Sequence, residues 1–292
     1  MTMRRLIPWV ACMALVACGL PARGETFKAV ASFSILADLV RNVGGSNVDV
    51  AMLVGPDSDA HVYSPTPKDA RKVAEARLIV INGLGFEGWL PRLVQSSGSK
   101  AGIVTATEGI VPLRLGSAAD PHAWQSVGNA KVYVANIRNA LAAADPANAG
   151  QYRANADAYL ARLDALEREV RDAIAKLPPA RRKVISTHDA FGYFAAAYGI
   201  EFVAPLGVST ESEPSARDVA RIISQIRQAK IPAVFLENFT DSRLMQRISA
   251  ETGAKVGGML YSDSLTGEKG DAPTYIDMVR HNIRALTRAL GD

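Results

Sequence analysis

The chain has 292 residues, with 33 basic and 29 acidic side chains, 48% hydrophobic and 21% charged residues. This composition is too apolar for a disordered chain and too balanced in charge for a dedicated nucleic-acid binder. A single hydrophobic core is near its size limit at this length, so two domains or two lobes are expected.

The first 24 residues have the pattern of a secretory signal peptide. Basic residues precede an apolar stretch (6–20) that is shorter than a bilayer-spanning helix, and small residues follow it. Cleavage after Gly24 is the preferred interpretation. The alternative is acylation of Cys18, because residues 15–18 resemble a bacterial lipobox. We therefore expect a periplasmic protein, or one anchored by lipid through Cys18.

Removal of this segment changes the charge balance and the cysteine content. Three Arg and no acid are lost, which leaves 30 basic and 29 acidic side chains, and this near-neutral balance argues against a nucleic-acid partner. Cys12 and Cys18 are both lost as well. The mature chain then has no disulfide, and any metal site must use His and carboxylate ligands.

Short β-rich runs alternate with helical patterns along the mature chain, which indicates an α/β fold with mainly parallel sheets. The candidate strands are 27–32, 48–54, 78–82, 102–105, 183–187, 201–203, 233–237 and 255–260. Four fall in each half. The sequence therefore predicts two lobes, each with a four-stranded sheet flanked by helices.

One long amphipathic helix is predicted between the two halves, over 147–177. Apolar residues recur there at spacings of three and four, Asp145-Pro146 is a good helix start, and Pro178-Pro179 is a firm stop. The alternative, two helices broken near Ala165, lacks a breaking residue. The expected organisation is an N-terminal lobe (25–144), a linking helix (145–178) and a C-terminal lobe (179–292).

Three of the four histidines lie after candidate strands or in turn-rich loops, where open parallel sheets bind ligands. They are His61, His122 and His188. The gaps of 61 and 66 residues between them match no local metal motif, so spacing alone is a weak signal. His281 lies among charged helical positions and is predicted to be solvated.

A carboxylate should complete a site of three neutral imidazoles around a dication. Asp263 follows the last predicted strand and Glu237 follows the strand before it. Either residue satisfies this requirement. The sequence pattern alone does not decide whether Asp263 or Glu237 is the fourth ligand.

A literal G-x-G-x-x-G occurs at Gly83 to Gly88, after a predicted strand and twenty residues before Glu108. This is the arrangement of a dinucleotide-binding fingerprint. However, Trp89 is bulky where a phosphate would approach, Pro91 falls in the first helical turn, and an exported protein would need its cofactor loaded before secretion. A tight turn with close helix–sheet packing is the favoured interpretation.

Several stretches in chain order resemble the periplasmic solute-binding proteins of bacterial zinc and manganese ABC importers. They are Ser32-Phe-Ser-Ile-Leu, His61-Val-Tyr-Ser-Pro-Thr-Pro-Lys-Asp, Asn82-Gly-Leu-Gly-Phe-Glu-Gly-Trp-Leu, Asp120-Pro-His-Ala-Trp, Thr187-His-Asp-Ala-Phe-Gly-Tyr-Phe, Ser209-Thr-Glu-Ser-Glu-Pro-Ser and Tyr261-Ser-Asp-Ser-Leu. They cover essentially the whole mature chain.

The resemblance implies two α/β lobes joined by a long helix, with one metal ion in the cleft between them. It also implies that an ABC permease and its ATPase are the partners. The implied metal ligands are His61, His122, His188 and Asp263. Asp263 is thereby preferred over Glu237, and Glu213 and Glu237 are left as cleft-lining or supporting residues.

The choice of metal depends mostly on His188, because manganese receptors of this group tend to have a carboxylate there. Three imidazoles and one carboxylate suit four-coordinate zinc, so zinc is predicted, with manganese or iron as the alternative. The loop at 115–120 lacks the His-rich insertion of many zinc receptors. Metal is therefore expected to arrive free or from a separate donor protein.

A binding protein, not an enzyme, is the predicted function, and a monomer is expected. A secreted zinc metallohydrolase is the main enzyme alternative, and it would need an open fourth position on the metal. A receptor for an organic ligand or siderophore would need a cleft lined by aromatic residues or Arg. Because the connector is a helix, small lobe adjustments are expected on metal binding rather than wide hinge closure.

Overall fold

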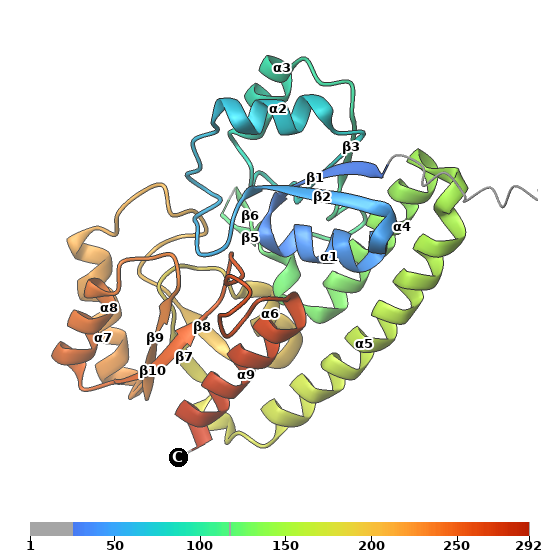
Figure 1. Cartoon of the computed structure of the whole chain (residues 1–292). Coiled ribbons are helices and arrows are strands. Elements are labelled where there is room, and N and C mark those ends of the chain that lie inside the picture. Colours follow the sequence, from blue (N-terminus) through green and yellow to red (C-terminus); the bar gives the residue numbers. More distant parts are fainter. Residues whose placement is uncertain (1–25, 117, 292) are drawn as a thin grey trace, which may run out of the picture.

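The computed structural model describes residues 26–116 and 118–291 (Figure 1). The predicted signal peptide, with Cys12 and Cys18, lies outside the described residues. Within the described ranges no helix has the length and apolar character needed to cross a membrane.

The first lobe contains a four-stranded parallel sheet in the order β2-β1-β3-β4. Its strands are β1 (Phe27–Phe33), β2 (Val48–Val54), β3 (Leu78–Ile81) and β4 (Gly102–Thr105). Alternate strand residues face opposite sides, so one face packs on α2 (Pro67–Glu75) and α3 (Leu90–Ser97). The other face packs on α1 (Ser34–Gly44) and α4 (Val127–Ala144) (Figure 1).

The second lobe repeats this architecture with the parallel order β10-β9-β7-β8. Its strands are β7 (Lys183–Ile185), β8 (Glu201–Val203), β9 (Ala233–Glu237) and β10 (Lys255–Leu260). The helices α7 (Ala216–Ala229) and α8 (Arg243–Thr252) pack on one face. The opposite face packs on α6 (Gly192–Tyr198) and α9 (Tyr275–Gly291). The predicted fold of two four-stranded parallel sheets is confirmed.

A long helix, α5 (Ala149–Ala175), links the lobes and runs alongside both of them (Figure 1). A short 3-10 turn, η3 (Pro146–Asn148), precedes it. The helix continues unbroken past Ala165, so the alternative of two shorter helices is wrong. Its buried face, from Tyr152 to Ile174, belongs to the same apolar core as α1, α4 and α9. The two lobes therefore share one core along this helix.

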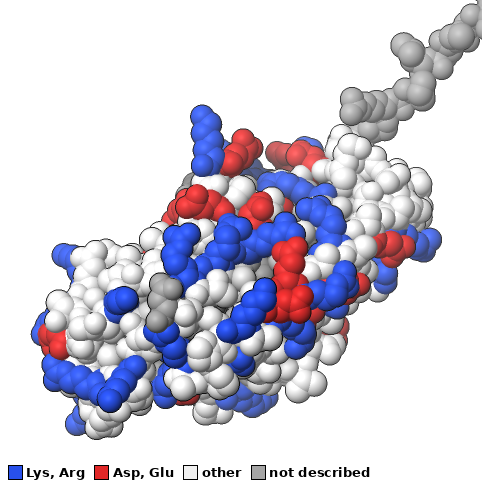
Figure 2. Space-filling view, turned by 90° about the horizontal axis from the view of Figure 1, so that it is seen from below, with Lys and Arg blue, Asp and Glu red and all other residues white. Residues whose placement is uncertain are grey.

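Exposed ion pairs add contacts around the linking helix. Arg280 of α9 pairs with Glu169 of α5 at 2.7 Å, and Lys131 of α4 pairs with Asp164 of α5 at 2.8 Å. Figure 2 shows the molecule from below, with Lys and Arg spread over the surface and Asp and Glu among them. Exposed pairs of this kind contribute about 0–1 kcal/mol each. The buried apolar face is the main connection between the lobes.

Candidate metal centre

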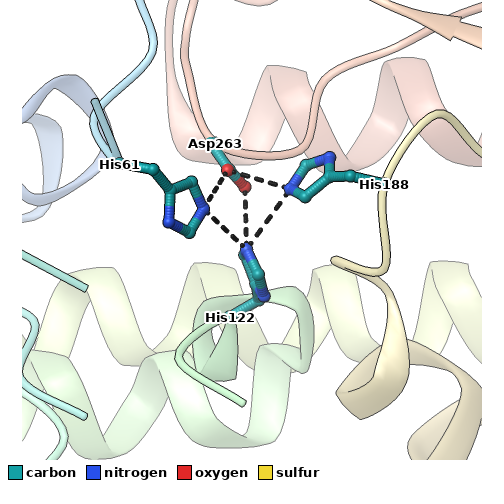
Figure 3. A group of neighbouring side chains, drawn as sticks. All are labelled: His61, His122, His188 and Asp263. Atoms are coloured by element: carbon teal, nitrogen blue, oxygen red, sulfur yellow. Dashed lines mark hydrogen bonds and ion pairs between the residues drawn. The ribbon is translucent and has the colours of Figure 1, made fainter. Parts of the chain in front are cut away.

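The side chains of His61, His122, His188 and Asp263 converge on one point, two from each lobe (Figure 3). His61 lies in the loop that follows β2, and His122 caps the short 3-10 helix η2 (Ala123–Gln125) before α4. His188 follows β7, and Asp263 follows β10. The structure thus brings together all four residues that the sequence predicts as ligands.

The distances among the four side chains fit one small cation. The Nε2 atom of His122 lies 3.3 Å from Nε2 of His61 and 3.4 Å from Nε2 of His188. Asp263 Oδ2 lies 3.1 Å from the Nε2 atoms of both His61 and His188. A tetrahedral shell with bonds of about 2.0–2.1 Å has edges of roughly 3.3–3.4 Å. These four distances are close to the edges of such a shell.

The cluster is almost completely removed from solvent. His122 and His188 are 0% exposed, Asp263 is 1% exposed, and His61 is 8% exposed. Among the described residues, Oδ1 of Asp263 has no hydrogen-bond partner, although it lies 3.6 Å from Nε2 of His122. A buried carboxylate oxygen without a partner is costly. A cation between the four side chains would satisfy it.

Two further carboxylates orient the imidazole rings. Nδ1 of His122 donates to Oδ1 of Asp120 at 2.7 Å, and Nδ1 of His188 donates to Oε2 of Glu237 at 2.6 Å. A proton on Nδ1 leaves the lone pair on Nε2, which faces the cluster. The carboxylates therefore hold both rings in the tautomer that a metal needs.

Glu237 also organises the surrounding backbone. Its Oε1 accepts from the backbone N–H groups of Thr187 at 2.9 Å and His188 at 3.1 Å, and its Oε2 accepts from the Ser262 hydroxyl at 2.6 Å. Glu237 is thus a supporting residue that fixes the segments before His188 and Asp263. Asp120, which orients the ring of His122 in the same way, was not predicted from the sequence, although its position two residues before His122 was a usable signal.

The neighbouring charges shift the pKa values of the cluster. Burial disfavours the charged form of His188, but the carboxylates of Glu237 and Asp263 outweigh burial and raise its pKa well above the ordinary value. For His122, burial is likewise outweighed by Asp263 and Asp120, and its pKa is raised. Burial alone would raise the pKa of Asp263, but the two histidines lower it well below its usual range. The site attracts positive charge.

Aromatic rings surround the three imidazoles. The ring centroids of Phe86 and His61 are 4.7 Å apart, those of Trp124 and His122 are 5.3 Å apart, and the Phe239 ring lies 5.7 Å from His188. Rings at this distance exclude bulk water from the cluster. Electrostatic interactions inside it are correspondingly stronger than in water.

The other candidate residues of the sequence lie outside the cluster. Glu213 is exposed and lines a neighbouring pocket. The prediction that His281 is solvated is wrong: its ring is half-buried against Tyr261, and its Nε2 lies 3.1 Å from the carbonyl oxygen of Met259. Its place on α9, packed against β10, buries one side of the ring.

The G-x-G-x-x-G stretch forms a tight turn closed by its own acid. The carboxylate of Glu87 accepts from the backbone N–H groups of Asn82 at 2.6 Å and Gly83 at 3.1 Å, and from the Ser32 hydroxyl at 2.6 Å. Gly83 has φ of 86°, and a Cβ there would lie 2.5 Å from Thr105 Cγ2. The carboxylate of Glu87 therefore occupies the two backbone donors at the start of this turn, where a phosphate would need them free.

Known proteins resemble this chain along most of its length. Among curated relatives, the "Iron-binding protein YfeA" of Yersinia pestis is 36% identical over 91% of this chain and 87% of its own length. The "Manganese-binding lipoprotein MntA" of Halalkalibacterium halodurans is 34% identical over 95% of both chains.

Solved structures resemble the fold as well. The "periplasmic zinc binding protein TroA" of Treponema pallidum is 32% identical and superposes with a TM-score of 0.87, over 91% of this chain and 99% of its own. A Mn-bound periplasmic metal-binding protein of Candidatus Liberibacter asiaticus is 32% identical with a TM-score of 0.83, over 91% of this chain and 100% of its own.

The family model described as "Zinc-uptake complex component A periplasmic" matches residues 29–289. This match covers both lobes, the linking helix and all four converging side chains. The chain belongs to this family of periplasmic metal-binding receptors that serve ABC importers.

Proposed function

We propose that the protein is a zinc receptor whose metal ligands are His61, His122, His188 and Asp263. The observation that carries this proposal is the convergence of three Nε2 atoms and one carboxylate from two lobes on a buried point. Three neutral imidazoles and one carboxylate are typical ligands of tetrahedral zinc. Because all four positions come from the protein, the ion is held as cargo.

Membership of the family defines the coarser function. The chain is an extracytoplasmic solute-binding receptor for a divalent metal, not an enzyme, and it works with an ABC permease and its ATPase. The metallohydrolase alternative is therefore wrong. Because residues 115–120 contain no His-rich insertion, we propose that the metal arrives free or from a separate donor protein, and we expect the receptor to act as a monomer.

Manganese or iron is the second candidate cargo, and one feature of the site favours it. Both oxygens of Asp263 face the cluster, with Oδ2 at 3.1 Å from two Nε2 atoms and Oδ1 at 3.6 Å from the third. A carboxylate that binds through both oxygens would give the higher coordination number that manganese accepts. The relatives named for iron and manganese agree with this alternative.

A competition titration with metal analysis tests the proposal. We expect the purified protein to carry one zinc per chain, and His188→Ala to weaken zinc binding while leaving the fold intact. His281→Ala is the matched control, because His281 lies outside the cluster. Unchanged zinc affinity in His188→Ala would refute the ligand assignment. Preferential retention of manganese by the wild type would favour the second candidate.

The route of membrane association is a separate proposal. Cleavage after Gly24 would release a periplasmic receptor, whereas acylation at Cys18 would anchor it, and the lipoprotein names of MntA and PsaA relatives support the second route. Mass spectrometry of the mature N-terminus distinguishes a chain that begins at Glu25 from one that begins at an acylated Cys18.

A further inference from the structure

A pocket of about 370 Å³ adjoins the metal cluster between the His61 loop and the second lobe. Three of its lining residues are joined to the cluster itself. Asp59 Oδ1 accepts from the backbone N–H of His61 at 2.8 Å, and Thr187 directly precedes His188. The ring of Phe239 contacts the ring of His188. The pocket is thus immediately outside the ligand shell.

A buried hydroxyl in the wall of this pocket points to a polar ligand. Thr187 is only 2% exposed, and among the described residues its Oγ1 has no hydrogen-bond partner. A buried hydroxyl without a partner is unfavourable, and native structures satisfy such groups with water or a ligand. The water shell of a hydrated ion in the pocket would provide that partner.

The charged residues that line the pocket favour a positively charged ligand. Asp59, Glu213 and Asp241 line it with Arg243 as the only cation among its lining residues, and Arg243 Nε donates to Asp241 Oδ2 at 2.6 Å. Glu213 is exposed, so its carboxylate is available to a hydrated ion. A hollow lined by an excess of one charge concentrates ions of the opposite charge.

The most accessible cluster residue belongs to a loop that reaches this pocket. His61 is 8% exposed, whereas the other three cluster residues are at most 1% exposed, and Asp59 of the same loop lines the pocket. At the same place Thr210 Oγ1 donates across the lobes to Asp59 Oδ2 at 2.6 Å. The pocket wall is thus joined to two of the four ligands, to His61 through Asp59 and to His188 through the ring of Phe239.

We propose that this pocket is the port of the metal site, where a hydrated divalent cation pauses on Thr187 Oγ1 and the Glu213 carboxylate before it exchanges water for the four ligands. This inference rests on the proposed function. A residue that contacts the ion only in passage changes the association and dissociation rate constants by the same factor. The equilibrium affinity is then unchanged.

Stopped-flow mixing of metal-free protein with zinc chloride, with a zinc-chelator chase for dissociation, tests the port. Thr187→Val removes the hydroxyl at nearly constant volume. We expect both rate constants to fall by roughly two- to tenfold, as for loss of one hydrogen bond, while Kd stays within about twofold. Thr105→Val is the matched control, because Thr105 lines a separate hollow beside β4. It should change neither rate.

Glu213→Gln provides a second, electrostatic test. We expect slower association at low salt, and a smaller difference from wild type at high salt. Glu268→Gln is its control, since Glu268 is an exposed acid in a different hollow. Unchanged rates in Thr187→Val and Glu213→Gln would overturn the port, as would a weaker Kd with unchanged association. Failure of the wild type to bind zinc at all would instead refute the proposed function.

Discussion

The Nδ1 atom of His188 lies 2.6 Å from Oε2 of Glu237, although 49 residues separate the two in sequence. The contact joins the carboxyl ends of β7 and β9, which are neighbours in the second sheet. It fixes the direction of Nε2, the atom that faces the cluster. The metal site therefore depends on a carboxylate that does not belong to the converging group.

Glu237→Gln should weaken zinc affinity by roughly 10- to 100-fold, the effect typical of losing a carboxylate behind a ligating His. The amide retains the shape of the side chain but no longer fixes the proton on Nδ1 of His188. A competition titration measures the change. Glu201→Gln is the control, because Glu201 lies at the exposed edge of the same sheet and pairs with Lys183. Equal affinities in both variants would contradict the role of Glu237.

Asp120→Asn should produce a similar loss through His122, whose Nδ1 and backbone N–H both bond to Asp120 Oδ1. An asparagine oxygen can still accept both hydrogen bonds, but each is weaker because the oxygen carries no charge. Isothermal titration with zinc is the measurement. An affinity equal to that of the wild type would show that the ring of His122 is held by its other contacts.

Zinc affinity should fall as the pH falls. The raised pKa values of His122 and His188 mean that the metal-free site binds protons above the ordinary imidazole value. A metal ion must displace those protons, so binding releases protons and weakens in acid. We expect a loss of more than about tenfold between pH 7.5 and 5.5. Affinity that stays constant over this interval would exclude a majority of His ligands.

Metal binding should stabilise the folded protein. At free zinc 100-fold above Kd, the free energy of unfolding should rise by about 2.7 kcal/mol, because only the folded chain assembles the four side chains. Thermal unfolding with and without a chelator measures this gain. His61→Ala should abolish most of it, and His281→Ala should retain it. A gain of equal size in both variants would place the ion elsewhere.

Zinc should change the overall dimensions only slightly. The buried face of α5 packs with α1, α4 and α9 in one continuous core, and the backbone N–H of Tyr275 donates across the lobes to Asp38 Oδ2 at 2.9 Å. A wide hinge motion would have to expose this core. Solution scattering should therefore show nearly equal radii of gyration with and without metal. A large compaction would contradict the rigid connection.

Most of the fold could be predicted because local patterns and packing agree. The strands Val48–Val54, Gly102–Thr105 and Lys255–Leu260 have the predicted bounds, since each is a β-rich run between turn residues. The helix after His122 was not predicted. Val127–Ala144 has a mixed apolar pattern without clear periodicity, and its burial is decided by contacts with α5 and the first sheet.

The converging residues were predicted from strand ends and family resemblance, whereas their supporting contacts depend on the folded chain. Glu237 determines which ring nitrogen of His188 carries the proton. The carbonyl oxygen of Ser262 accepts hydrogen bonds from Trp124 and Gln125 of the first lobe. These partners are 49 to 138 residues apart. Chain spacing carries no signal for such contacts. The half-buried position of His281 was missed for the same reason.

Anomalous diffraction at the zinc edge from zinc-loaded crystals tests the central claim most directly. We predict one peak within about 2.0–2.2 Å of the Nε2 atoms of His61, His122 and His188 and of an oxygen of Asp263. A peak at another place, or one bound by fewer than three of these imidazoles, would contradict the account.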